Sequence, residues 1–330
     1  MSSSTFALLV LCGTVTAAAS RPSQAPQPAG RIVGVEAFGH TVINLDQTVT
    51  FYEQAFGLEL TQTVPKPSAD AAIKALTNTA GAYRSAEMRL PGTRFVLRLM
   101  EFSGQRTLAK PRQTDPGQTD LLLRVRDVDA AFERLRLSGA GVITIGGKPV
   151  ARGGVSSSVF TRDLDGYVIE TVRGGQQPSS DEATGNVTAA VIAMTADDTD
   201  KKLGFYRDFL GLEMVTGNWG GSQTIMDMVG AGRGEFRQSN TTVGISGTTE
   251  RLEFYEYRNV PEKTLFKPRL TDVPASMVSF VVSNIDDMVA LAKSSGLPIL
   301  TAGGAPVRVG TSRRVIVQDP DGVFVEFVQK

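Results

Sequence analysis

Apolar residues along the chain alternate between strand-like runs and helix-like stripes. An apolar run at residues 38–43 predicts a strand, and the stripe of Val49, Tyr52 and Phe56 predicts a helix at residues 48–56. The Gly57-Leu58 pair is a stop signal for this helix. The elements expected next are strands near residues 87–90 and 95–102.

The same order of elements follows in the next stretch of the chain. The expected elements are a strand at residues 121–125, a helix at 128–137, and strands at 142–145, 158–162 and 167–172. The common unit is therefore one strand, one helix and three strands. Four such units are expected, with the third near residues 188–257 and the fourth near residues 277–328.

Three segments recur in the same order at a nearly constant offset, which indicates an internal duplication. The matches are residues 51–60 with 205–214, 110–115 with 267–272, and 163–170 with 319–326. A cluster of Gly, Gln, Pro, Ser and Asp near the middle of the chain is typical of a linker. The expected organisation is a first domain at residues 31–175, a linker at 176–185 and a second domain at 186–330.

The amino terminus has the outline of a secretory signal peptide, with an apolar run at residues 6–11 and small residues before Ser20. We expect a signal peptide at residues 1–20, a flexible leader at 21–30 and a secreted or periplasmic protein. A disordered extension is the alternative, because the first five residues carry no Lys or Arg. The apolar run is too short for a membrane span.

Composition narrows the classes of function. The 330 residues include 34 basic and 34 acidic side chains, and this balance argues against nucleic acid as a partner. A single Cys excludes a disulfide framework, and a single His excludes metal centres built on two histidines of one chain. The sequence leaves open a homodimer.

Several motifs together resemble the vicinal oxygen chelate superfamily, the family of glyoxalase I, extradiol dioxygenases and bleomycin resistance proteins. The residues that carry the resemblance are Phe51-Tyr52 with residues 56–59, Phe205-Tyr206 with residues 210–213, Asp127-Val128-Asp129, and Asp-x-Asp-Gly-x-x-x-Glu at 163–170 and 319–326. The resemblance implies an α+β fold of four βαβββ modules, paired into two tandem domains. Each domain is then expected to form a curved sheet that encloses a cup.

In catalytic members of the superfamily, a divalent metal lies in each cup, held by residues of the first and last strands of the paired modules. The positions that the resemblance implies are Ala37, Arg98, Asp120 and Glu170 in the first half, and Val191, Glu253, Met277 and Glu326 in the second. Neither set is a convincing metal site, because one contains an arginine and the other two apolar side chains. We therefore prefer no cofactor, and we expect an ion pair between Arg98 and Glu170.

The single histidine, His40, offers an alternative. It lies three residues after Ala37, and an odd separation places it on the opposite face of a regular strand. If the loop after this strand were shorter than usual, His40 could join Asp120 and Glu170 and bind Fe, Mn, Ni or Zn. The other interpretation is a histidine hydrogen-bonded at the face or edge of the sheet.

Three functions follow from the resemblance and the residues. We prefer a metal-poor cup that binds a small organic molecule, as the bleomycin resistance branch does. The residues expected to line the cups are Arg98, Asp120, Glu170, Trp219, Glu253 and Glu326. The alternatives are a metal-dependent lyase of the glyoxalase I type or a dioxygenase, and a metal-independent isomerase with Glu170 or Glu253 as general base, Glu326 being a further catalytic candidate.

Overall fold

The computed structural model describes residues 32–154, 156–174, 184–242 and 251–330. The expected signal peptide and leader lie outside the described residues, as does most of the expected linker. The first described strand begins at Ile32.

The first half of the chain contains two modules with the expected order of elements. Module one comprises β1 (Ile32–Thr41), α1 (Leu45–Phe56), β2 (Glu59–Ser68), α2 (Ala71–Thr77), β3 (Tyr83–Arg89) and β4 (Val96–Phe102). Module two comprises β5 (Thr119–Val125), α3 (Val128–Leu137), β6 (Gly141–Val142), β7 (Val150–Gly153), β8 (Ser156–Arg162) and β9 (Val168–Arg173). Asn44 and Asp127 cap the two long helices by accepting backbone N–H groups, and the left-handed Gly57 ends α1.

The second half repeats this order. Module three comprises β10 (Val187–Ala196), α4 (Thr199–Leu203), the π-helical segment η1 (Gly204–Phe209), β11 (Met214–Thr216), α5 (Gln223–Met228), β12 (Glu235–Thr242) and β13 (Arg251–Arg258). Module four comprises β14 (Ser276–Val282), α6 (Ile285–Ser294), the 3₁₀ turn η2 (Ala302–Gly304), β15 (Val307–Val309), β16 (Ser312–Gln318) and β17 (Phe324–Gln329). The α+β fold with four modules is therefore confirmed, and the short helices α2 and α5 are additions that the hydrophobic pattern did not predict.

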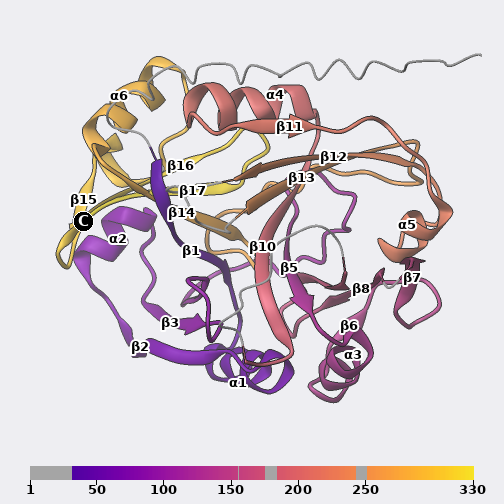
Figure 1. Cartoon of the computed structure of the whole chain (residues 1–330). Helices are drawn as coiled ribbons and strands as arrows, with labels where there is room; N and C mark the ends of the chain where they lie inside the picture. Colours follow the sequence, from indigo (N-terminus) through magenta and orange to yellow (C-terminus); the bar gives the residue numbers. More distant parts are fainter. Residues whose placement is uncertain (1–31, 155, 175–183, 243–250) are drawn as a thin grey trace, which may run out of the picture.

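The strands form two sheets, and each sheet joins a module of the first half to a module of the second. The eight-stranded sheet has the order β15-β16-β17-β14-β1-β4-β3-β2, and the nine-stranded sheet has β11-β12-β13-β10-β5-β9-β8-β6, with β7 beside β8 (Figure 1). The central contacts are the antiparallel pairs β1 with β14 and β10 with β5. Modules one and four thus form one cup, and modules two and three form the other, so a cup is not confined to one half of the chain.

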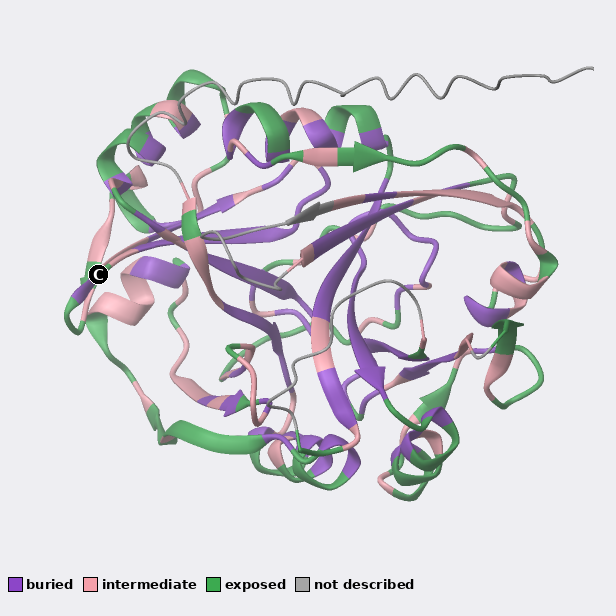
Figure 2. Ribbon diagram, in the orientation of Figure 1, coloured by how far each residue is buried: buried purple, intermediate pink, exposed green. Residues whose placement is uncertain are grey.

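One large apolar core joins the two sheets and their helices. It includes Phe38 and Phe280 of the eight-stranded sheet, Leu121 and Phe254 of the nine-stranded sheet, and helix residues such as Tyr52. Helix α1 packs on α3, and in Figure 2 the central strands are buried whereas β2 and β11 at the sheet edges are exposed. No helix in the described part of the chain is long and apolar enough to cross a membrane.

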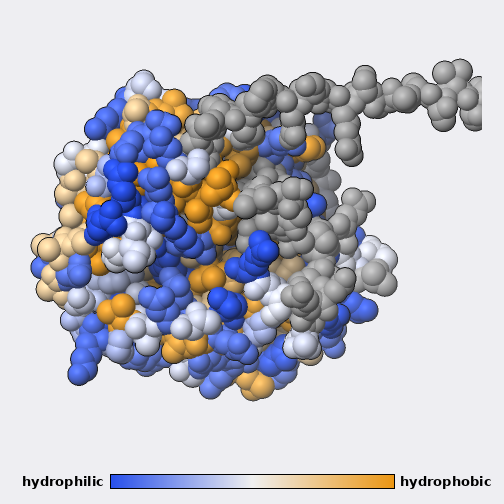
Figure 3. All heavy atoms as spheres, turned by 60° about the vertical axis from the view of Figure 1, so that its left-hand side comes forward, coloured by the Kyte–Doolittle hydropathy of each residue, from blue (hydrophilic) through white to orange (hydrophobic). Residues whose placement is uncertain are grey.

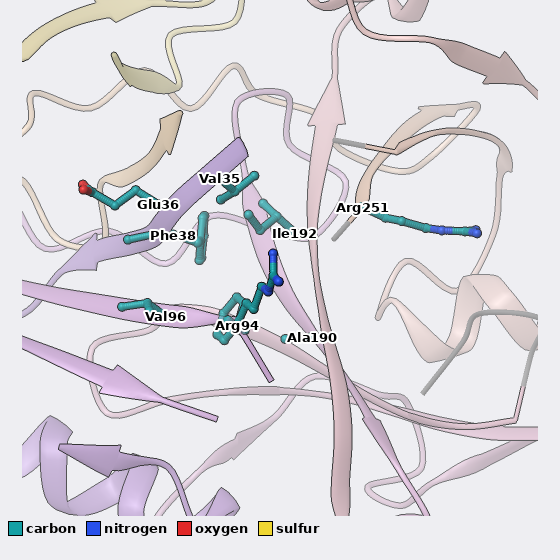
Figure 4. Close-up of a pocket in the computed structure, with 10 residues that line it drawn as sticks. Val35, Glu36, Phe38, Arg94, Val96, Ala190, Ile192 and Arg251 are labelled. Atoms are coloured by element: carbon teal, nitrogen blue, oxygen red, sulfur yellow. The ribbon is translucent and has the colours of Figure 1, made fainter. Parts of the chain in front are cut away.

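The two cups open in different directions from this core. Figure 4 shows the small pocket between β1 and β10, where Glu36 and Arg251 point away from one another on opposite sides. Glu36 belongs to the eight-stranded sheet and Arg251 to the nine-stranded sheet. The two charged side chains therefore lie on different sheets, one toward each cup (Figure 4).

Candidate ligand-binding cups

The eight positions that the resemblance implies for metal ligands form the floors of the two cups. The register of the central strands divides them into two groups that differ from the sequence prediction. Ala37, Arg98, Met277 and Glu326 belong to β1, β4, β14 and β17 of the eight-stranded cup. Asp120, Glu170, Val191 and Glu253 belong to β5, β9, β10 and β13 of the nine-stranded cup. The expected sets were wrong because the modules pair across the halves, and the expected ion pair of Arg98 with Glu170 is wrong for the same reason.

An ion-pair network closes the floor of the eight-stranded cup. The Arg98 guanidinium donates to Glu326 at 2.9 Å and to Glu36 at 3.0 Å, and it also lies 2.9 Å from Glu87. Arg314 on β16 contacts Glu36 at 2.9 Å and Glu326 at 3.1 Å. A β-bulge between Val35 and Ala37 accompanies the turn of Glu36 toward this network.

The two arginines of the network favour the charged form of Glu36. Burial opposes the charge of Glu36, but Arg314 and Arg98 together lower the pKa of this carboxyl below its usual value. Glu326 also accepts a hydrogen bond from Ser279, so its buried oxygens are satisfied. Both Glu326 oxygens are thus held by the network and by Ser279.

A cavity of about 420 Å³ lies above this floor. Its apolar wall consists of Val64, Ile73, Leu76, Met100, Met277, Val309 and Ile316. Its charged lining consists of Asp70, Glu87, Glu326, Arg98 and Arg314, so acidic side chains outnumber basic ones. Helix α2 covers one end of the cup, held by Thr301, which donates to the Leu76 carbonyl at 3.1 Å. The molecular face in Figure 3 likewise mixes hydrophilic and apolar side chains.

The nine-stranded cup has a different floor, with acidic residues on three of its central strands, β5, β9 and β13. Asp120 accepts a hydrogen bond from Gln113 at 2.6 Å, and its other oxygen has no partner among the described residues. Glu170 accepts a hydrogen bond from Ser158 at 2.7 Å and lies 3.5 Å from Arg152. Both carboxyls are almost fully buried.

Burial shifts the pKa of these two carboxyls upward. It raises the pKa of Glu170 to about 7, although Arg152 and the Ser158 hydroxyl act in the opposite direction. The pKa of Asp120 lies well above its usual value because of burial and the nearby Glu170. Glu170 is thus the described side chain of this floor best placed to gain or lose a proton near neutral pH.

Glu253 lies at the border between this floor and a cavity of about 400 Å³. One of its oxygens accepts hydrogen bonds from the Tyr255 hydroxyl at 2.7 Å and from Gln238 at 2.8 Å. The cavity is lined by Leu122, Arg124, Arg152, Ser156, Val172, Gly174, Gln238, Asn240, Arg251, Glu253 and Tyr255. A base role for Glu170 or Glu253 stays a prediction.

His40 faces away from the eight-stranded cup, as its odd separation from Ala37 predicted. Its ring lies 3.2 Å from the Tyr52 hydroxyl and 3.3 Å from Asp163, and it stacks on Tyr167 with ring centroids 4.3 Å apart. Burial lowers the pKa of His40 to about 4. The structure therefore supports a core histidine, and His40 does not join Asp120 and Glu170.

Trp219 does not line a cup. Its ring lies beneath the guanidinium groups of Arg258 and Arg237, at 4.2 and 5.2 Å from the ring centroid. Arg237 is paired with Glu256, on the face of β12 and β13 opposite Gln238 and Glu253. The expectation of a ligand contact by Trp219 is corrected accordingly, since the tryptophan packs against the face of these strands opposite the cup.

The residues of neither cup fit the divalent metal that the resemblance implies. In the eight-stranded cup a guanidinium lies among the carboxylates, and its charge opposes a cation. In the nine-stranded cup the orphaned oxygen of Asp120 is a possible donor, but its neighbours have separate partners. Within residues 32–330 as far as they are described, no three His, Cys, Asp or Glu side chains converge to hold a metal ion.

Sequence reasoning missed the residues that complete the floors, namely Glu36, Glu87, Arg314, Gln113 and Arg152. One signal was present in the repeated Lys-Pro-Arg segment, where Gln113 corresponds to Leu270. Gln113 binds Asp120, whereas Leu270 packs in one cluster with Met277, the counterpart of Asp120. The difference within the repeat therefore indicated that this one position of the floor is polar in the nine-stranded cup and apolar in the eight-stranded cup.

Four βαβββ modules that form two cupped sheets define a class of proteins with paired ligand cups. The chain belongs to the Glyoxalase/Bleomycin resistance protein/Dioxygenase superfamily, which it matches over residues 34–171 and 188–327. No curated protein matches the chain.

Solved structures share this fold at low sequence identity. Glyoxalase I from Zea mays superposes with a TM-score of 0.60 and 17% identity, over 91% of this chain and 92% of that one. A putative dioxygenase from Bacillus subtilis superposes with a TM-score of 0.57 and 13% identity, over 91% of this chain and 86% of that one. At these identities the similarity establishes the fold.

Proposed function

We propose that the chain binds a small organic molecule, neutral or positively charged, in the eight-stranded cup without a metal ion. The observation that carries this proposal is the ion-pair network of Arg98, which occupies the floor where a metal would need donors. A cavity of about 420 Å³ remains above the network, which is within the size range of small-molecule sites.

The lining of the cup supports this class of ligand. Met100 and Met277 offer polarizable, adaptable surface for a planar apolar body. Acidic side chains outnumber arginines in the lining, and this excess of negative charge favours a neutral or cationic ligand over an anion. The floor itself contributes the paired charges of the Arg98 network.

Titration with Nile red, a neutral planar fluorophore, tests the proposal. Met277→Trp should fill the cavity and weaken dye binding at least tenfold, which is a loss of roughly 1.4 kcal/mol of binding free energy. Leu122→Trp is the matched control, because it fills the nine-stranded cup and leaves this cavity open. Equal affinities of wild type and Met277→Trp, or loss of binding only in the control, would refute the assignment.

We also propose that the protein is exported, on the basis of the signal-peptide pattern at residues 1–20. Export predicts a mature chain that begins near Arg21. Amino-terminal sequencing of the protein from the periplasm or medium of its own host tests this. A chain that retains Met1 in the cytoplasm would contradict it.

A further inference from the structure

The cavity of the nine-stranded cup differs from the other cavity in charge. Three arginines line it, on three different strands, and the acidic side chain in the lining is Glu253. Arg124 comes from β5, Arg152 from β7 and Arg251 from the start of β13. A cavity with this lining attracts anions, whereas the eight-stranded cup does not.

Two of the arginines, Arg124 and Arg251, lie close enough to influence one another. Burial lowers the pKa of Arg124, Glu253 opposes this shift, and the like charge of Arg251 adds to it. Among the described residues, the Arg251 side chain has no hydrogen-bond or ion-pair partner, and its backbone pairs with β12. An anion beside Arg124 and Arg251 would relieve their repulsion and accept hydrogen bonds from the Arg251 guanidinium.

The rest of the lining suits an organic anion. Leu122 and Val172 form an apolar wall next to the arginines, and Val191 packs against them from β10. The Tyr255 hydroxyl and Gln238 are both engaged with Glu253 at the inner end of the cavity. The lining thus offers cations for an anionic group and an apolar surface for a carbon skeleton.

We propose that the nine-stranded cup binds a small organic carboxylate, whose anionic group lies between Arg124, Arg152 and Arg251 and whose apolar part lies on Leu122 and Val172. Carboxylates match the planar, forked geometry of a guanidinium. The site is separate from the eight-stranded cup, so this inference does not depend on the function proposed above.

Binding should be linked to protonation of Glu170. Arg152 lies 3.5 Å from Glu170 and lowers the pKa of that carboxyl. A bound anion that draws Arg152 toward itself and adds negative charge nearby will raise the pKa of Glu170 above about 7. Binding at neutral pH is therefore expected to take up a fraction of a proton and to weaken as the pH rises to 8.5.

Calorimetric titration with benzoate and phthalate, compared with neutral benzamide, tests the proposal on the full chain. Wild type should bind at least one of the two anions at least tenfold more tightly than benzamide. Arg251→Gln and Arg152→Gln should each weaken that binding at least tenfold. Arg89→Gln, which changes an exposed arginine of β3, is the matched control and should leave it unchanged.

Further measurements separate the outcomes. Thermal unfolding of each variant shows that a loss of binding is not a loss of fold, and titrations in two buffers of different ionisation enthalpy report proton uptake. Equal affinity for benzoate and benzamide, no anion binding at 10 mM ligand, or unchanged binding in both arginine variants would overturn the proposal.

Discussion

Single substitutions between the two halves of the duplication separate the two cups chemically. Asp120 with Gln113 forms a polar pair, and the corresponding Met277 with Leu270 forms an apolar contact. The change at position 120 is thus accompanied by a matching change in its partner, as buried polar groups require. In the core, Thr48 donates to Asp165, and its counterpart Lys202 bridges Asp319 and Asp321, so a different polar side chain contacts the same aspartate of the repeat.

Glu170 gives the most direct prediction at this scale. Its pKa is near 4.5 in an unfolded chain and about 7 in the folded protein. The folded state therefore binds the proton more tightly. The corresponding stability is fully present below pH 4.5 and is lost as the pH rises to 7, by about 3 kcal/mol.

Glu170→Gln should remove this pH dependence, because the amide is neutral throughout and its oxygen can still accept from Ser158. Urea unfolding at pH 4.5, 6 and 7.5 measures the effect as the difference between wild type and variant. Glu59→Gln, at an exposed position of β2, is the control. A constant difference between wild type and Glu170→Gln across this range would show that Glu170 titrates normally.

At the scale of elements, alternation along β1 separates the two faces of the eight-stranded sheet. Phe38 and His40 face the common core, whereas Gly39 lies beside Arg98 and Met277 in the register of the cup. A Cβ at Gly39 would lie 2.3 Å from the Arg98 carbonyl, so the close approach of β1 and β4 requires glycine. Gly39 therefore allows the close packing of β4, the strand that carries Arg98 at the centre of the network.

Arg98→Ala should destabilise the protein by about 3 kcal/mol, because it leaves Glu326 and Glu36 buried with reduced compensation. Arg89→Ala, at an exposed position of the same sheet, should change the free energy of unfolding by less than about 0.5 kcal/mol. Chemical denaturation at pH 7 measures both. Similar small values for the two variants would mean that the network contributes little to stability.

The order of strands and helices could be predicted because the hydrophobic period and the helix stop signals are local features of the sequence. The helix at residues 128–137 agrees with α3, and the strand expected at residues 158–162 lies within β8. The short α2 and α5 were missed because neither shows a long apolar stripe. Arg314 was missed in the floor because its place depends on how β16 pairs with β17, which no local pattern reports.

At the scale of the whole molecule, the pairing of modules decides which residues meet. All four modules have the same strand order, so the sequence pattern alone does not distinguish pairing within a half from pairing across halves. The structure pairs β1 with β14 and β5 with β10. This arrangement brings Arg98 to Glu326 and leaves Glu170 with Ser158 and Arg152.

Separate halves should therefore be incomplete. Fragments of residues 32–174 and 184–330 each lack the partners of two central strands, whose unpaired edges favour self-association. Mixed or coexpressed, they should form a one-to-one complex of the mass of the whole, measured by size exclusion with light scattering. A first fragment that is monomeric and unfolds cooperatively on its own would contradict the pairing across the halves.

The central claim is that the eight-stranded cup, closed by the Arg98 network, binds its ligand without a metal. The most direct test is a Nile red titration of the protein before and after removal of metals with EDTA, with metal content measured on the same samples. The treated sample should contain less than about one metal ion per ten chains. The account predicts that both samples bind Nile red with the same affinity. Binding that is lost with the metal and restored by stoichiometric Fe, Mn, Ni or Zn would contradict it.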